Sequence, residues 1–281
     1  MGFKLGYSTY ALKMIDPFNA IRMIKDTGYE FLELCLSEDC ITSPASFPID
    51  KQIDLQRLCE DSGFPSPIFF GDIDVCANAS DRVSMLELTK KKFEMAHQIQ
   101  SDYSTVMITT TLGRSAPPWE SGKERIRDAF HSMADLASKN DVILAVEAHA
   151  GTDFETPEKV VWLIEQISNP NLKIDLDISH FVVEGSQIGH SVKLCAPHTV
   201  MVHIKDGEKK YDEVRFDLPG SGNIDVIEFL EALRLNSLEE MPVYAEVSVQ
   251  QSSRKDYDPL KTAGFCFNIL DDARKKIESF N

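Results

Sequence analysis

Four strand-like runs in the second half of the chain each end on a side chain that can bind a metal ion. These side chains are Glu147, Asp177, His203 and Glu246. Successive residues of a strand point to opposite faces, so each run has one apolar face and one face that carries the candidate ligand. Four parallel strands with these groups on the same face and at the same end would build one site.

Strand and helix patterns alternate along the whole chain, which predicts a parallel (β/α)8 barrel, a TIM barrel, as a single domain over residues 1–281. An open doubly wound sheet would need a glycine-rich turn after the first strand, and Ser8-Thr-Tyr-Ala-Leu is not one. The strands are expected at 3–9, 31–36, 67–75, 106–110, 142–147, 172–178, 200–205 and 243–247. The helices are expected at 17–28, 49–59, 81–100, 120–138, 157–167, 188–195, 224–233 (capped by Asn223) and 259–280.

Composition excludes several classes of function. The net charge of −16 repels polyanions and argues against a nucleic-acid partner. The run Lys90-Lys91-Lys92 is interpreted as a solvated helix face. No segment is apolar enough for a membrane span, and six scattered cysteines without a CxxC pair favour reduced thiols in a cytoplasm. No stretch of sequence reveals an interface, although barrels of this kind often form homo-oligomers.

The carboxyl ends of barrel strands, and the loops after them, form the active site of this fold. Three carboxylates and one imidazole there would suit a single divalent ion, Mn²⁺, Mg²⁺, Co²⁺ or Zn²⁺. A lone Glu or His at a strand end is more often structural, but four matched polar residues on a buried face are costly without a shared cation. The pattern therefore predicts a metal site at Glu147, Asp177, His203 and Glu246.

The order of these motifs resembles the xylose isomerase-like TIM-barrel superfamily, in particular its sugar-phosphate isomerase and epimerase branch, which includes ketose 3-epimerases, hydroxypyruvate isomerase and inosose dehydratase. The motifs are Glu147, Asp177-x-x-His180, His203-x-Lys205-Asp206, Pro219-Gly-Ser-Gly-Asn-Ile224 and Glu246. The resemblance implies that the four ligands hold one divalent ion. It also implies that Glu147 and Glu246 transfer protons and that His180 contacts the substrate.

The chain departs from the epimerase pattern at two places. The epimerases commonly have an Arg six residues after the ligand His, where this chain has Lys209, which is included in the expected substrate-binding set. Their extra Glu after the first ligand matches only Asp153. Endonuclease IV-type nucleases of the same superfamily need histidines after strands three and four. The segments after these strands lack them here, and His97 falls within a helix pattern as an expected surface residue, so a nuclease is not favoured.

The expected chemistry is an isomerase or epimerase reaction on a sugar, sugar phosphate or polyol. A metal ion would polarise the substrate carbonyl, one carboxylate would remove the proton beside it, and the second would return a proton through an enediolate. A dehydratase, for example of an inosose, uses the same first step and is the alternative. A sugar-binding barrel without activity is the third reading.

For several other polar residues near the strand ends, the sequence allows two interpretations. Glu33 lines the pocket or pairs with a Lys, and His149 supports a ligand or contacts substrate. Lys205 binds a substrate oxyanion or forms a salt bridge within the barrel, and Asp206 joins the substrate-binding set at the start of the seventh loop. Asp175, deeper on the face of Asp177, is expected to hydrogen-bond to a neighbouring strand, with Lys173 as the candidate partner. Trp119 and Trp162 are expected to pack in the core.

Overall fold

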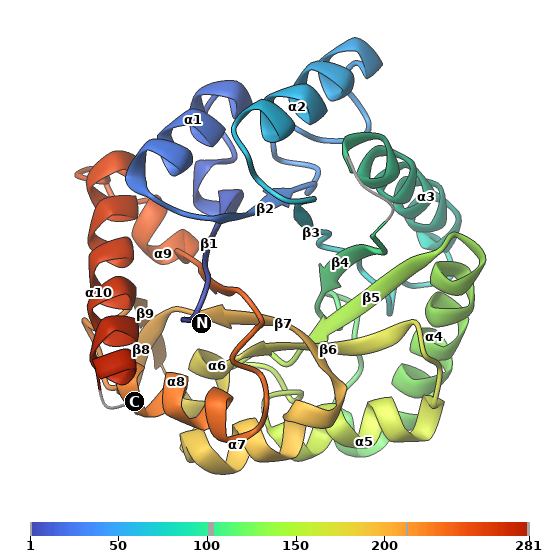
Figure 1. The fold of residues 1–281 in the computed structure, drawn as a ribbon. Helices are drawn as coiled ribbons and strands as arrows, with labels where there is room; N and C mark the ends of the chain where they lie inside the picture. Colours follow the sequence, from blue (N-terminus) through green and yellow to red (C-terminus); the bar gives the residue numbers. More distant parts are fainter. Residues whose placement is uncertain (1, 101–103, 212, 280–281) are drawn as a thin grey trace.

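Eight parallel strands close into a barrel, as the alternating pattern predicts (Figure 1). The computed structural model describes residues 2–100, 104–211 and 213–279. Closure comes from the pairing of the first strand with the last, Leu5 lying opposite Val243. Around the barrel the order is β1-β10-β7-β6-β5-β4-β3-β2. The strands are β1 Leu5–Ser8, β2 Phe31–Cys35, β3 Ile68–Phe70, β4 Val106–Thr110, β5 Val142–Glu147, β6 Leu172–Asp177, β7 Thr199–Ile204 and β10 Val243–Ala245.

A ring of helices surrounds the strands (Figure 1). The main helices are α1 Pro17–Thr27, α2 Ile49–Asp61, α3 Arg82–Ile99, α4 Trp119–Lys139, α5 Pro157–Ile167, α7 Ile188–Cys195, α8 Val226–Leu235 and α10 Pro259–Ser279. Short turns of helix not expected from the sequence are Thr9–Leu12, α6 Ile178–Val183, Ala196–His198 and α9 Val249–Ser252. Within the described part of the chain, no helix combines the length and apolarity that a membrane crossing requires.

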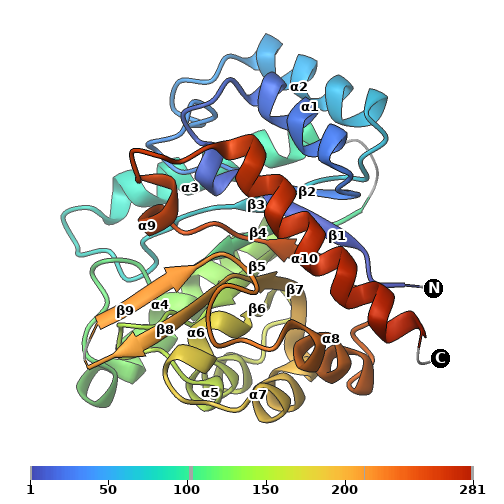
Figure 2. The ribbon, with the colours of Figure 1, turned by 90° about the vertical axis from the view of Figure 1, so that its left-hand side faces the viewer.

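The segment after β7, expected only as a polar excursion, forms an antiparallel hairpin. Its strands are β8, Asp206–Lys210, and β9, Glu213–Asp217. Figure 2 shows the hairpin projecting from the end of the barrel opposite to the start of β1. It therefore stands over the end at which the candidate ligands lie.

The helix ends follow the local sequence with one exception. Asp16 caps α1 by accepting from Asn19 N, and Gly28 ends α1 with a φ of 114°, as expected. Asn223 does not cap α8. Asp225 does so, accepting from the backbone N–H groups of Ile227 and Glu228, because it immediately precedes the first helical residue. The expected end of the last helix, Phe280, lies outside the described residues.

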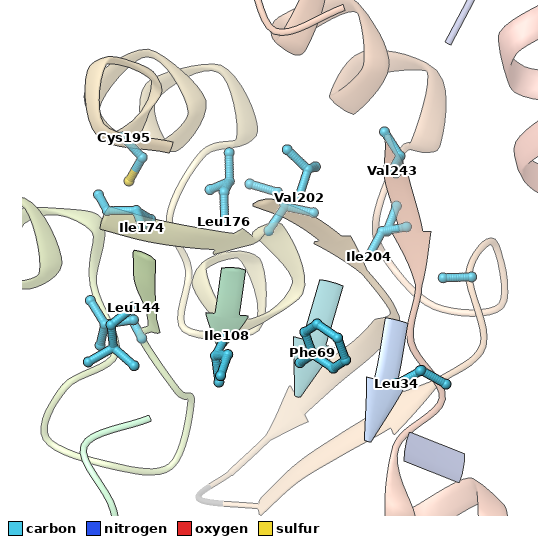
Figure 3. Packing of buried hydrophobic residues seen from close by; sticks show 14 of the residues in the cluster. Leu34, Phe69, Ile108, Leu144, Ile174, Leu176, Cys195, Val202, Ile204 and Val243 are labelled. Carbon is cyan, nitrogen blue, oxygen red and sulfur yellow. The ribbon is translucent and has the colours of Figure 1, made fainter. Parts of the chain in front are cut away.

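The two faces of the strands carry different layers of side chains. Outward-pointing residues such as Leu144, Ile174 and Val202 pack against the helices in the main hydrophobic core (Figure 3). The lower interior of the barrel holds a smaller apolar cluster of Ile68, Ala145, Met201 and Tyr244. This cluster fills the interior beneath the polar inward residues, and the cavity that reaches those residues lies on their other side.

The lysine run of α3 is only partly solvated. Lys90 and Lys91 are exposed, but Lys92 is buried and points toward the barrel. Its ammonium donates to the carbonyls of Gly71, at 2.5 Å, and Asp72, at 3.1 Å. The prediction of a fully solvated face is wrong for Lys92, because these carbonyls after β3 compensate its desolvation.

Gly6 of β1 provides a test of barrel packing. A Cβ atom at this position would lie 2.3 Å from the ring of Tyr244 on the neighbouring strand. Gly6→Ala should lower the free energy of unfolding by about 1–3 kcal/mol through overpacking. Gly264→Ala is the control, because a Cβ there meets nothing within 4 Å and lies in α10. A urea midpoint of Gly6→Ala equal to the wild-type value would contradict this account of the packing.

Candidate active site

Three carboxylates converge at the carboxyl end of the barrel. Glu147 ends β5, Asp177 ends β6, and Glu246 follows β10. Each offers an oxygen within 4.8 Å of the others, and all three side chains are buried. The alternation of the strands brings together residues far apart in sequence, as predicted for these three positions. We call them the carboxylate trio.

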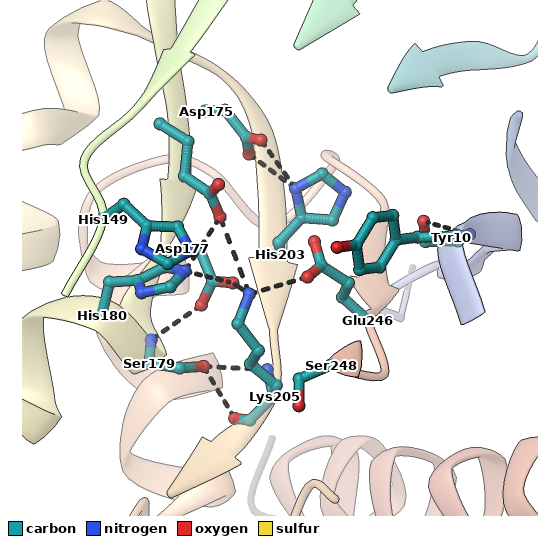
Figure 4. Close-up of polar contacts among 12 residues, drawn as sticks. Tyr10, His149, Asp175, Asp177, Ser179, His180, His203, Lys205, Glu246 and Ser248 are labelled. Atoms are coloured by element: carbon teal, nitrogen blue, oxygen red, sulfur yellow. Dashed lines mark hydrogen bonds and ion pairs between the residues drawn. The ribbon is translucent and has the colours of Figure 1, made fainter. Parts of the chain in front are cut away.

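The ammonium of Lys205 lies among the carboxylate trio (Figure 4). Its Nζ forms a short ion pair with Asp177 Oδ2, lies 2.9 Å from Glu246 Oε1 and 3.7 Å from Glu147 Oε1. Burial opposes the charge on Lys205, but Asp177 and Glu246 overcome this effect and raise its pKa well above the usual value. Of the two readings from the sequence, the salt bridge is the contact that the structure shows.

Two acids of the trio, Glu147 and Glu246, have pKa values shifted in opposite directions. Burial raises the pKa of Glu246, although the Lys205 ammonium opposes the shift. Burial acts in the same direction on Glu147, but Lys205 and His180 outweigh it and bring the pKa of Glu147 well below its usual range. Two carboxyl groups that face the same space are thus held in electrostatically different surroundings.

His180 faces the trio as a hydrogen-bond donor. The backbone N–H of Ala150 donates to His180 Nδ1 at 3.1 Å, so the proton of the neutral ring lies on Nε2. Nε2 is 3.2 Å from Glu147 Oε1. Burial and the nearby Lys205 lower the pKa of His180, which favours this neutral form. Glu147, His149 and His180 also bring ligand atoms within 4.8 Å of one another, but a protonated Nε2 cannot hold a metal ion.

His203, predicted as the fourth ligand, makes its polar contacts below the trio. Its Nδ1 lies 2.8 Å from both oxygens of Asp175, and its Nε2 lies 3.3 Å from Glu33 Oε1. Among the described residues, neither group of ligand atoms within 4.8 Å of one another includes His203. Asp175 does hydrogen-bond across to a neighbouring strand, as expected, but its partner is His203 rather than Lys173. The role of His203 as a ligand stays a prediction.

The remaining predicted site residues occupy different places. Glu33 is fully buried beside His203 in the lower layer. His149 lines the cavity and packs against His180 in a tilted arrangement, with ring centroids 4.0 Å apart. Lys209 lies on the hairpin, where its ammonium forms a short ion pair with Glu184. His97 is exposed on α3, as expected.

Asp206 is buried and holds the chain rather than facing the cavity. Its carboxylate accepts from the backbone N–H groups of Gly207 at 2.7 Å, Gly222 at 2.9 Å and Ile224 at 3.1 Å. The residue thereby ties the start of the hairpin to the segment that leads into α8. Its part in substrate binding stays a prediction.

A cavity of about 650 Å³ opens above Glu147, Lys205 and Glu246. Sequence reasoning missed most of its wall, which is rich in aromatic rings: Tyr10, Phe70, Trp119, Phe154 and Phe216. Trp119 both packs against Trp162, as expected, and lines the cavity. Their positions in the sequence could have identified them, because these residues lie in or beside the segments that follow strands. Phe216 is the exception, since it lies in the hairpin.

The sequence model described as "Xylose isomerase-like TIM barrel" matches residues 21–262. The chain belongs to this family. The match covers the strands that carry Glu147, Asp177, His203 and Glu246.

Individual relatives within the xylose isomerase-like family are distant. The chain is 22% identical to D-psicose 3-epimerase of Ruminiclostridium cellulolyticum over 228 residues, which cover 76% of this chain and 72% of that protein. It is 23% identical to inosose dehydratase of Clostridium perfringens over 161 residues, about half of each protein (52% and 53%). The solved structure of the IOLI protein with a binding zinc atom superposes with a TM-score of 0.78 at 17% identity, covering 98% of this chain and 99% of that one.

The residues of the trio suit a divalent cation. Carboxylate oxygens are preferred ligands of Mg²⁺ and Mn²⁺, and Zn²⁺ also accepts them. Among the described residues, Glu147 Oε1 is buried near His180 Nε2 and the Lys205 ammonium but has no well-aligned hydrogen-bond donor, which leaves its lone pairs available. Together the three acids offer more negative charge than one ammonium neutralises. The donor set therefore fits a metal ion.

The three hydrogen bonds of Asp206 give a testable prediction. Asp206→Ala should lower the free energy of unfolding by about 1–3 kcal/mol or more, because it leaves buried N–H groups without an acceptor. The variant Glu208→Gln, two residues further along β8 and half-exposed in a surface ion pair with Arg215, should stay close to wild type. Thermal unfolding of both variants is the measurement. Equal melting temperatures would show that Asp206 does not hold the hairpin.

Proposed function

We propose that this chain is a divalent-metal-dependent isomerase or epimerase of a small sugar, in which Glu147 and Glu246 carry the proton. The observation behind the proposal is that both carboxylates line the same cavity, from β5 and from the segment after β10, within 4.8 Å of each other and of Asp177. The epimerase among the relatives supports the same reaction class.

Each side chain that faces the cavity has a separate chemical role, set by its position. One glutamate removes the proton beside the substrate carbonyl, and the other returns a proton to the opposite face or to the neighbouring carbon. His180 donates its Nε2 proton toward a substrate oxygen beside Glu147. A divalent ion held by the trio, with His203 as its predicted fourth ligand, would supply Lewis acidity that stabilises the negative charge of the enediolate. The closed lower barrel limits water to the cavity side.

The cavity wall favours an unphosphorylated substrate. Among the described residues that line it, the cations are Arg114 and Lys205. Arg114 has a 90% exposed side chain, and Lys205 is paired with the trio, whereas Asp72 and Asp153 add negative charge to the wall. A phosphate group would meet net repulsion there, while the aromatic rings offer apolar faces for the C–H groups of a sugar.

A dehydratase is the second candidate. The observation in its favour is the His149–His180 pair beside Glu147, because loss of a β-hydroxyl as water requires a proton donor at the leaving oxygen. The two candidates share the first proton abstraction and differ in product. Incubation of the metal-loaded protein with unphosphorylated ketoses and inososes in D₂O, followed by NMR, distinguishes an isomer from a dehydrated product.

Glutamine substitutions test the proton carriers. Glu147→Gln and Glu246→Gln should each lower turnover by about 10²–10⁴-fold, because glutamine cannot accept or return the proton. Incorporation of solvent deuterium at the carbon beside the carbonyl is the readout, and Glu165→Gln, exposed on α5, is the control. Wild-type deuterium incorporation in both Glu147→Gln and Glu246→Gln would show that the two glutamates do not transfer the proton. Absence of exchange in wild type with every sugar tried would favour a binding protein.

Metal removal tests the trio directly. Treatment with a chelator should abolish turnover, and Mn²⁺, Mg²⁺, Co²⁺ or Zn²⁺ should restore it. The same ion should raise the melting temperature, since a ligand bound only by the native state at about 100 times its Kd adds about 2.7 kcal/mol of stability. Elemental analysis of the purified protein identifies the ion. Activity that survives complete metal removal would contradict the proposal.

A further inference from the structure

Lys205 occupies the space among the three carboxylates that a metal ion would share. Its Nζ is paired with Asp177 Oδ2 and lies 2.9 Å from Glu246 Oε1. The third acid is also close, with Glu147 Oε1 at 3.7 Å. The side chain of Lys205 is 3% exposed, so these contacts are desolvated. The ammonium is therefore the counter-ion of the trio.

A divalent ion held by the trio would draw on the same three carboxylates as this ammonium. A metal ion binds carboxylate oxygens at about 2.0–2.6 Å, closer than the ammonium stands from Glu246. Two cations that shared these oxygens would also repel each other at short range within a buried site, where screening is weak. Binding of the metal ion thus requires that the ammonium move away.

The surroundings of Lys205 let the side chain move without the backbone. Ser179 Oγ donates to the carbonyl of Lys205 at 2.8 Å and accepts from its N–H at 2.8 Å, which fixes the main chain. The side chain lines the cavity, with its Nζ 5.4 Å from the ring centroid of Phe216. Rotation about the side-chain bonds would carry the ammonium from the trio into the cavity, along the aromatic wall.

We propose that Lys205 is a displaceable resident cation, which holds the carboxylate trio together without metal and competes with the divalent ion for it. This inference rests on the metal site of the proposed function and adds a determinant of metal affinity. It also places the displaced ammonium in the cavity that the substrate would enter.

Calorimetric titration of chelator-treated, full-length protein with Mn²⁺ tests the proposal. Lys205→Met removes the competing charge and keeps most of the side-chain volume, so it should bind Mn²⁺ at least about tenfold more tightly than wild type. Lys193→Met, which removes an exposed ammonium on α7, should bind as wild type does. Equal or weaker Mn²⁺ binding by Lys205→Met would overturn the displacement. Absence of binding by both proteins would overturn the metal site itself.

A second measurement uses the wild-type chain, in case Lys205→Met does not fold. Acetylation by a small reagent, read by peptide mass spectrometry, should label Lys205 weakly without metal and several-fold faster at saturating Zn²⁺. Lys92, whose ammonium is buried against the carbonyls of Gly71 and Asp72, is the internal control and should stay unchanged. Identical labelling of Lys205 with and without bound Zn²⁺ would show that its ammonium does not leave the trio.

Discussion

The mutual repulsion of three buried carboxylates is the constraint on which the upper half of the barrel depends. Strand register fixes the positions of Glu147 and Asp177, so these acids cannot move apart without breaking the sheet. Like charges in a dry interior are costly unless a cation is placed among them. Lys205 meets this need, and Ser179 holds the backbone that carries it. Closure of the barrel and charge compensation are therefore linked.

A second charged layer lies below the first and limits what His203 can do. Burial raises the pKa of Asp175 to about 7, although contact with His203 opposes the shift. Burial would lower the pKa of His203, but Asp175 and Glu33 raise it well above its usual value. Since Nδ1 is engaged by Asp175, only Nε2 remains for another partner. A metal ion that recruits this nitrogen must compete with Glu33 for it.

The sequence predicted which side chains point inward, because that property depends only on the two-residue period of a strand. It did not predict which of two inward residues reaches the acids. His203 and Lys205 share a face, but their heights along the barrel axis depend on how neighbouring strands are staggered, including the irregular register between Ile174 and Asp175. The hairpin escaped prediction because its strands are short and mostly charged, with Val214 and Phe216 as the apolar pair on one face of β9. Phe216 acquires its place only through contacts distant in sequence.

Phe216 connects the hairpin to the chemistry beneath it. Its ring packs edge-on against His180, with centroids 4.9 Å apart, and lies over the ammonium of Lys205. Asp206 stands at the base of the same hairpin, directly after the residue that carries this ammonium. Because one continuous segment supplies the cation of the trio, the anchor of the loop and the aromatic wall, a shift of the hairpin would change the cavity and the charge balance of the acids together. The position of the hairpin over the site and the charge balance of the acids are thus coupled, because both depend on the same stretch of chain.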